Sequence, residues 1–450
     1  TSSQTSNIQI PDPVKNFILQ FHRNVTDNNV YELHNIYDNS FNKLTEKYYL
    51  KQAWPESEIV APLVNNDQVF IILYRELYYR HIYSYLTPTL DHRFRSYENY
   101  CDLFNYILNS KGPVSLELPN QWLWDIIDEF IYHFQSFCNF RDRIKKTEQE
   151  LKLLEENAQI WSSYSVLNVL SSFVQKSCIN EQLLVSKNGG DMIETAGEYG
   201  SHQLYKMLGY FSLVGLLRVH CMLGDYTLAL KTMENVVLNK KATFARVTAC
   251  HVSTYYYVGF VYMMTRRYAD AIRAFSTILS FIHKTKQYHS SSYQFDQNLK
   301  KSDQMYALLA ISWRAALQDA KGSDPHQQQV KVFMSDIENQ INLPILRSFM
   351  KLYATMGIDK LAKFLEVDSE ELRTQLLIFK QRSRQYKWTS GNLLEGEYVS
   401  TFDLDFCIKQ DVIHISESKV ARRYGDWFLR NINRSEDILV NLELYKSYKK

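Results

Sequence analysis

Three carboxylates follow a pair of tryptophans and are the residues whose spacing could support acid–base catalysis. Asp125, Asp128 and Glu129 recur at helical spacing, and carboxylates on one helix face can act as a general acid and a general base. The surrounding segment, which carries Trp122 and Trp124, is the most hydrophobic helix that the sequence predicts. On such a helix, carboxylates more commonly cap the helix, pair with arginine or face solvent. We therefore expect a structural role for them.

No other motif predicts catalysis, a cofactor or a metal site. The twelve histidines are dispersed, and none forms HExxH or a Cys/His zinc spacing. His81, His133 and His220 fall inside predicted helices, where we expect structural roles. Gly189-Gly190 lacks the residues of a phosphate-binding loop, and no GxSxG elbow occurs. The sequence therefore predicts a protein that is not an enzyme and that binds no cofactor or metal.

Composition argues against several other classes of function. The 450 residues include 51 basic and 49 acidic side chains, so a net charge of +2 gives no bulk attraction to nucleic acid. The six cysteines are scattered singly, as in a reducing compartment. Residues 1–13 are polar, and the longest apolar runs, Met207–Leu217 and Val252–Met264, are too short to span a bilayer and fit amphipathic helices. We expect a soluble, cytoplasmic protein with no membrane contact.

Few helix breakers and many aromatic residues predict a mostly helical protein. The chain has 14 glycines and 9 prolines against 32 tyrosines and 24 phenylalanines, which favours helices packed on helices. Tyrosines cluster at Tyr74–Tyr85 and Tyr255–Tyr257, which would suit stacking on nucleic-acid bases. They lack the glycine-flanked strands of RNA-binding sheets, so we favour a role in core packing.

Residues 358–415 have the plan of a winged helix. A short amphipathic helix at Ile358–Leu365 precedes a second helix at about Ser369–Tyr386. After a glycine-bearing loop come residues 404–408, which alternate apolar and polar, and residues 412–415, which are rich in β-branched side chains. Helix, turn, helix and a small β-hairpin are the parts of this fold.

The second predicted helix carries a row of basic residues. They recur at spacings of seven, four and three, which would place them on one face: Arg373, Lys380, Arg384 and Lys387. Such a face can bind phosphates, but Leu377 interrupts it. Two alternatives stay open, a nucleic-acid contact and a solvated or protein-facing surface, and we favour the second.

The segment before the winged helix predicts a helical-repeat solenoid. Residues 161–320 fit paired antiparallel helices, and Gly259, Tyr262, Ala271 and Phe275 fit the small and aromatic positions of a tetratricopeptide (TPR) repeat. Such pairs stack into a curved rod with long surfaces for partners. We therefore predict four parts: an N-terminal helical region (1–160), TPR-like helical repeats (161–335), a winged-helix domain (336–415) and a long C-terminal helix (416–450).

The C-terminal helix has an apolar side that needs to be buried. We expect a bundle with helices of other chains to cover it. The candidate bundle residues are Trp427, Phe428, Ile432, Leu439 and Leu442.

Solenoid repeats followed by a winged helix and a terminal helix resemble the PCI family, whose members occur in the proteasome lid, the COP9 signalosome and translation initiation factors. Longer runs resemble the subunit L family of eukaryotic translation initiation factor 3. These runs are residues 116–130, 205–218, 388–391, 411–415 and 420–426. The likeness covers nearly the whole chain. It departs at residues 315–330, where that family usually has a longer connection.

The resemblance implies a non-catalytic scaffold in a hetero-oligomer, the PCI/MPN core that binds the small ribosomal subunit and organises mRNA recruitment. It implies other initiation factor 3 subunits as partners, with subunits K and E as close neighbours. It also implies that the winged helix packs on neighbouring PCI subunits. The wing residues that contact a partner or fill the wing's own core are Leu404, Phe406, Ile408, Ile413 and Ile415.

Two other functions stay open from the sequence. The first is a PCI scaffold subunit of a proteasome-lid or COP9-signalosome-like complex, which would share the architecture and differ in its neighbours. The second is a nucleic-acid-binding winged helix that uses the basic row of the second helix.

Overall fold

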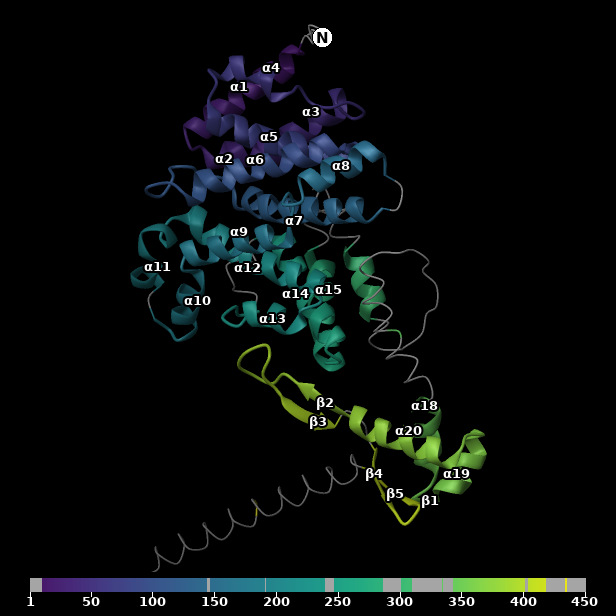
Figure 1. Cartoon of the computed structure of the whole chain (residues 1–450). Coiled ribbons are helices and arrows are strands. Elements are labelled where there is room, and N and C mark those ends of the chain that lie inside the picture. The colour runs from purple at the N-terminus through teal and green to yellow at the C-terminus, as the bar shows by residue number, and fades with distance from the viewer. Residues whose placement is uncertain are drawn as a thin grey trace, which may run out of the picture.

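A computed structural model describes residues 10–143, 146–190, 192–238, 247–285, 301–309, 334, 343–400, 404–417 and 434. Within these ranges the chain is helical up to α18, and the strands follow residue 354. The helices stack in layers above a smaller unit that contains the strands (Figure 1). The expected fold, mostly α with helical repeats followed by a winged helix, is confirmed for these residues.

The N-terminal helices begin and end where local side chains dictate. Asp67 accepts hydrogen bonds from the backbone of Val69 and Phe70 and so caps α5, and Thr89 forms a capping box with His92 at the start of α6. The elements are α1 Asp12–Thr26, α2 Val30–Asn35, the π-helix η1 Ile36–Ser40, α3 Phe41–Tyr48, α4 Ser57–Val60, the 3₁₀ helix η2 Ala61–Val64, α5 Gln68–Tyr85, α6 Leu90–Leu108, α7 Asn120–Asp142 and α8 Glu148–Glu156.

The next helices form the repeat region, in which small residues allow close packing. Gly259 lies against the ring of Phe275, and Tyr262 and Ala271 are buried beside them, so the predicted repeat positions meet in space. The elements are α9 Ser163–Lys176, α10 Ile179–Lys187, α11 Met192–Gly200, α12 Gln203–Leu223, α13 Tyr226–Thr232, α14 Thr248–Met264 and α15 Tyr268–Thr285.

Helix α12 differs from its prediction. The sequence predicted an amphipathic helix, but every side chain from Leu204 to Cys221 except Lys206 is buried, because α7, α9, α13 and α14 surround it. It is the one described helix long and apolar enough to cross a membrane, and 78% of its most apolar window is buried inside the protein. One continuous core joins α1 to α15, and we call this part the helical unit. The predicted boundary at residue 160, between the N-terminal helical region and the repeats, does not coincide with a break in that core.

The winged helix has a separate core. Its helices bury Leu361, Leu372, Leu376 and Phe379 against the sheet, and its three antiparallel strands follow the order β1-β5-β4. Positive φ angles at Gln410 and Asp411 form the turn of the wing. The elements are α18 Leu343–Leu352, β1 Thr355–Gly357, α19 Ile358–Leu365, α20 Ser369–Arg382, β4 Leu404–Lys409 and β5 Val412–Glu417.

The predicted second helix is too long at its C-terminal end. It ends at Arg382, and β2 Arg384–Lys387 pairs with β3 Glu397–Ser400 to form a second sheet. The expected glycine-bearing loop is the tip of this β2–β3 hairpin, which extends from α20 towards α14 and α15 (Figure 1). Pairing with β3 and contact with the helical unit outweigh the local helical pattern of residues 383–386.

Candidate protein-interaction site

The five predicted wing residues lie in or against the core of the winged helix. Leu404, Phe406 and Ile413 are buried, and Ile408 and Ile415 pack against them half-buried. The ring of Phe406 stacks on that of Phe379 with centroids 5.9 Å apart. In this chain the three buried side chains leave little surface for a partner.

The four predicted basic residues do not share a helix face. Arg373 pairs with Asp411 at the tip of the wing, and the ammonium of Lys380 lies 3.6 Å from the carboxylate of Asp405. Arg384 and Lys387 lie on β2, three positions apart, so their side chains leave opposite faces of the strand. The β-hairpin of the wing thus supplies counter-charges to α20, and no continuous basic face forms among these four residues.

Several apolar side chains on the helices of the winged helix are exposed. On α20, Leu377 is 58% exposed and Ile378 is also exposed. Phe364 on α19 and Leu352 on α18 are exposed as well, Leu352 by 73%. Exposed apolar clusters mark protein-interaction sites more often than scattered apolar residues do. Leu377, which interrupts the basic row in the sequence, belongs to this apolar surface.

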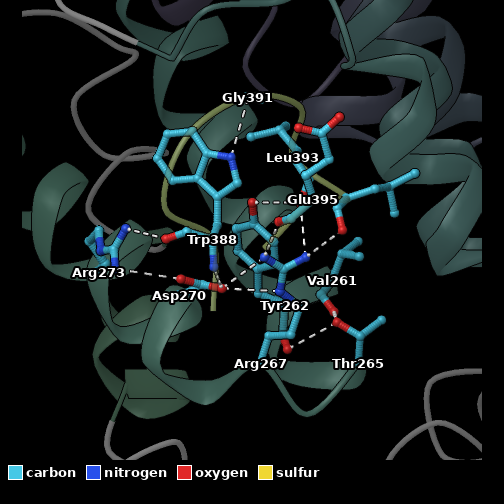
Figure 2. A network of polar contacts seen from close by, with 11 residues as sticks. Val261, Tyr262, Thr265, Arg267, Asp270, Arg273, Trp388, Gly391, Leu393 and Glu395 are labelled. Atoms are coloured by element: carbon cyan, nitrogen blue, oxygen red, sulfur yellow. Dashed lines mark hydrogen bonds and ion pairs between the residues drawn. The ribbon is translucent and has the colours of Figure 1, made fainter. Parts of the chain in front are cut away.

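The tip of the β2–β3 hairpin docks on the helical unit. Leu393 is 5% exposed and belongs to the core of that unit rather than to the core of the winged helix. Its carbonyl accepts hydrogen bonds from the hydroxyl of Tyr262 at 3.2 Å and from Nη1 of Arg267 at 3.0 Å (Figure 2). We call these contacts, together with those of Asp270, the joint.

Arg267 and Asp270 form the buried ionic centre of the joint. Nε and Nη2 of Arg267 each lie 3.0 Å from Oδ2 of Asp270, and the same oxygen accepts the backbone N–H of Trp388 at 2.9 Å. Arg267 is 7% exposed and Asp270 is 3% exposed. Arg273 lies at the edge, 3.6 Å from Oδ1 of Asp270, and donates to the carbonyl of Trp388 (Figure 2).

A second polar contact flanks the joint. Nζ of Lys187 donates to Oδ1 of Asn392 at 3.1 Å, and Nδ2 of Asn392 donates to Glu234 at 2.8 Å. A mostly apolar cavity of ≈ 460 Å³ lies between this contact and the ionic centre, lined in part by Val258 and Trp388. The helical unit therefore contacts the hairpin tip at Trp388 and along residues 392–395.

Comparison with known proteins identifies the family. The model of the family described as RNA polymerase I-associated factor PAF67 matches residues 92–318 and 313–435. Proteins named eukaryotic translation initiation factor 3 subunit L are 48% identical in Mycosarcoma maydis, over 96% of this chain and 74% of the relative, and 47% identical in Homo sapiens, over 95% of this chain and 90% of the relative. The Nematostella vectensis relative is 47% identical over 96% of this chain and 93% of its own length. The chain belongs to the family of eukaryotic translation initiation factor 3 subunit L.

Two of the three carboxylates that could suggest catalysis pair with arginine in this member of the subunit L family, and Glu129 lies 3.7 Å from Nε2 of His133. Oδ1 of Asp128 accepts from Nη1 of Arg218 at 2.6 Å, and Asp125 lies 3.6 Å from Nη1 of Arg80 and accepts from the hydroxyl of Tyr37. These arginine pairs were the expected structural role. The cavity beside them measures ≈ 70 Å³, a volume that suits a few water molecules rather than a substrate.

Burial favours the protonated, neutral form of the carboxylates in this cluster. It raises the pKa of Asp125 and of Glu129 to about 7, against the attraction of Arg80, which lowers both. Burial also raises the pKa of Glu76 well above its usual value, although Trp122 donates to its carboxylate at 2.9 Å. In the described part of this subunit L family member, no group of three His, Cys, Asp or Glu residues is placed to hold a metal ion.

The sequence missed the joint. Arg267 and Asp270 were seen only as part of a repeat segment, and Leu393 was not singled out. Gly259 lies in the predicted TPR-like repeat and Trp388 in a run that resembles the subunit L family, but no local pattern pairs residues more than a hundred positions apart. The predicted bundle residues Trp427, Phe428, Ile432, Leu439 and Leu442 lie outside the residues that the structure describes.

Proposed function

We propose that the chain is a non-catalytic scaffold subunit of the translation initiation factor 3 complex in the cytoplasm. In this proposal it assembles the PCI/MPN core and supports recruitment of the small ribosomal subunit and of mRNA. The observation that carries the proposal is the similarity to proteins named as subunit L over 95% or more of the chain. The paired carboxylates and the small cavity beside them support a non-catalytic role.

The winged helix and the C-terminal segment are the proposed contacts to other initiation factor 3 subunits, with subunits K and E as neighbours. Because Leu404, Phe406 and Ile413 of the wing are buried, the proposed contact uses the exposed apolar residues of α20 and α19. Leu377 and Phe364 are its most exposed members on those helices. Residues 416–450 supply the proposed bundle helix.

A tagged full-length chain, purified at moderate salt and analysed by mass spectrometry of its partners, tests the complex. We expect initiation factor 3 subunits together with small-subunit ribosomal proteins. Recovery of proteasome-lid or COP9 signalosome subunits would instead support the alternative PCI assemblies. Because β5 extends to Glu417, deletion of residues 418–450 should release the chain from its partners without unfolding the rest, and retained assembly of this variant would contradict the bundle contact.

Nucleic-acid binding by the winged helix is the second candidate, since Arg373, Lys380, Arg384 and Lys387 all lie on α20 or β2. Binding through them should weaken steeply with salt, because phosphate contacts release counterions. Reversing Arg373, Lys380 and Arg384 to glutamate should then abolish RNA binding by the purified chain. RNA binding unchanged by the reversal would exclude this contact.

A further inference from the structure

The winged helix and the helical unit have separate cores, and one side chain from the winged-helix part lies in the core of the helical unit. Among the described residues of the winged-helix part, Leu393 alone is buried in the core of the helical unit. Burying a leucine side chain removes apolar surface from water and so stabilises the contact. This one side chain therefore attaches a loop of the winged helix to α14 and α15.

Arg267 fixes the shape and direction of that loop. Its guanidinium donates to three successive carbonyls, those of Leu393 and Leu394 through Nη1 and that of Glu395 through Nη2, at 3.0, 3.4 and 3.2 Å. It also packs between the rings of Tyr262 and Tyr386, at 4.7 and 5.3 Å from their centroids. A planar guanidinium with fixed donor directions accepts only one arrangement of these acceptors.

Asp270 makes this arrangement costly to break. It is the counter-charge of Arg267 and also holds the N–H of Trp388, at the other end of the hairpin tip. Removing one partner of a buried ion pair leaves the other charge uncompensated. The two residues thus hold the tip at its start and at its end.

The β2–β3 hairpin connects the docked tip rigidly to the core of the winged helix. Strand β2 begins two residues after the end of α20, and Ser383 between them donates its N–H to the carbonyl of Phe379 at 2.9 Å. Phe379 is fully buried in the core of the winged helix. At the tip, a Cβ on Gly396 would lie 2.4 Å from the carbonyl oxygen of Lys387, so the two strands approach as closely as glycine permits.

We propose that Arg267 and Asp270 are positioning residues that fix the orientation of the winged helix relative to the helical unit. The joint makes the apolar surface of α20 point in one direction from the helical repeats. The orientation is a property of the isolated chain. Its consequence for assembly rests on the proposed function.

Two native cysteines allow the orientation to be measured. Cys101 on α6 and Cys407 on β4 are exposed, while Cys221 and Cys250 are buried, so a labelling reagent reaches the first two. In the full chain with Cys138→Ser and Cys178→Ser, spin labels on Cys101 and Cys407 report the distance between the units by pulsed electron paramagnetic resonance. We expect a single narrow distance distribution.

Arg267→Ala and Leu393→Ala should each replace the narrow peak with a broad distribution while circular dichroism shows unchanged helix content. The matched control is Leu394→Ala, because Leu394 is the next residue in the loop and is 37% exposed, and this variant should keep the narrow peak. Leu393→Ala serves as the independent variant if Arg267→Ala fails to fold.

A narrow peak retained in folded Leu393→Ala or Arg267→Ala would overturn the inference, as would a broad distribution in the parent chain. Partner recovery by the tagged chain is a separate measurement. Failure of that recovery with a narrow peak in the parent would contradict the proposed function and leave the joint intact.

Discussion

At the scale of single residues, several buried or half-buried arginines in the described part of the chain lie beside carboxylates. Arg80, Arg218 and Arg267 each face a carboxylate within hydrogen-bonding or ion-pair distance. Such pairs add little net stability compared with apolar packing, but breaking one of them is costly. Their effect on specificity is greater, because each pair allows one arrangement of the two elements that it joins.

The half-buried carboxylates Asp125 and Glu129 predict a pH-dependent stability. Burial raises the pKa of Asp125 and Glu129 to about 7 in the folded chain, against about 4 in an unfolded one. The stabilising contribution of the bound protons is therefore fully present below about pH 4 and is lost as pH rises through 7. Asp125→Asn should flatten this decline in the free energy of unfolding by about 1–3 kcal/mol, as measured by urea unfolding from pH 5 to 8.

The control for this titration is Asp27→Asn, which removes a carboxylate that is 61% exposed and pairs with Arg23 on the surface. Its unfolding free energy should follow the parent's pH profile. A profile of Asp125→Asn as steep as that of the parent would contradict the assigned role of burial.

A single methyl group should disturb the repeat packing. In Gly259→Ala the new Cβ would lie 2.6 Å from the ring of Phe275, which is fully buried and has no free space. Overpacking of this kind costs about 1–3 kcal/mol, more than the ~1 kcal/mol that alanine gains over glycine in a helix. Chemical denaturation should show the loss. Gly357→Ala is the matched control, because its Cβ would have no atom within 4 Å, and a similar loss there would contradict the packing argument.

At the scale of elements, the surface of α20 should bind a partner without stabilising the fold. Leu377→Asp places a charge on an exposed position, so unfolding should change by less than about 0.5 kcal/mol while recovery of partner subunits is lost. Leu228→Asp, an exposed leucine on α13 of the helical unit, is the control and should retain the partners. Unchanged recovery with Leu377→Asp would exclude this surface.

Local patterns predicted the elements that local forces determine. The winged-helix plan and the small and aromatic positions around Gly259 and Phe275 could be predicted, because the periodicity and spacing of apolar residues determine them. The end of α20 at Arg382 could not, since strands β2 and β3 span four residues each and depend on contacts with α15. The burial of α12 on all sides likewise depends on its packing against α7, α9, α13 and α14, which its own sequence pattern does not reveal. The same holds for the site. The alternation of residues 404–408 singles out the wing residues, whereas no local pattern reveals the contacts of Arg267 and Asp270 with the hairpin tip.

At the scale of the whole molecule, the joint should couple the unfolding of two cores. Calorimetry of the parent chain should show one cooperative transition, because the buried pair and Leu393 connect the units. Arg267→Ala should separate it into two transitions, as expected when the interface between domains is weakened. A single transition in Arg267→Ala would show that the units are coupled by other contacts, and Arg23→Ala, on the exposed surface of α1, should leave the single transition in place.

Because Leu393 completes a core whose other fully buried members, among the described residues, precede it by at least eighty positions, the order of synthesis matters for this protein. On the ribosome, helices α1 to α15 emerge and pack before the hairpin exists, so the nascent helical unit has an apolar slot that is not yet filled. Domains generally fold as units during synthesis, and exposed apolar surface makes incomplete chains prone to aggregation. Polypeptides that end before residue 388 would keep that slot open and become ready substrates for chaperones and proteases. The hairpin in the last quarter of the chain therefore also decides whether the first three quarters escape degradation.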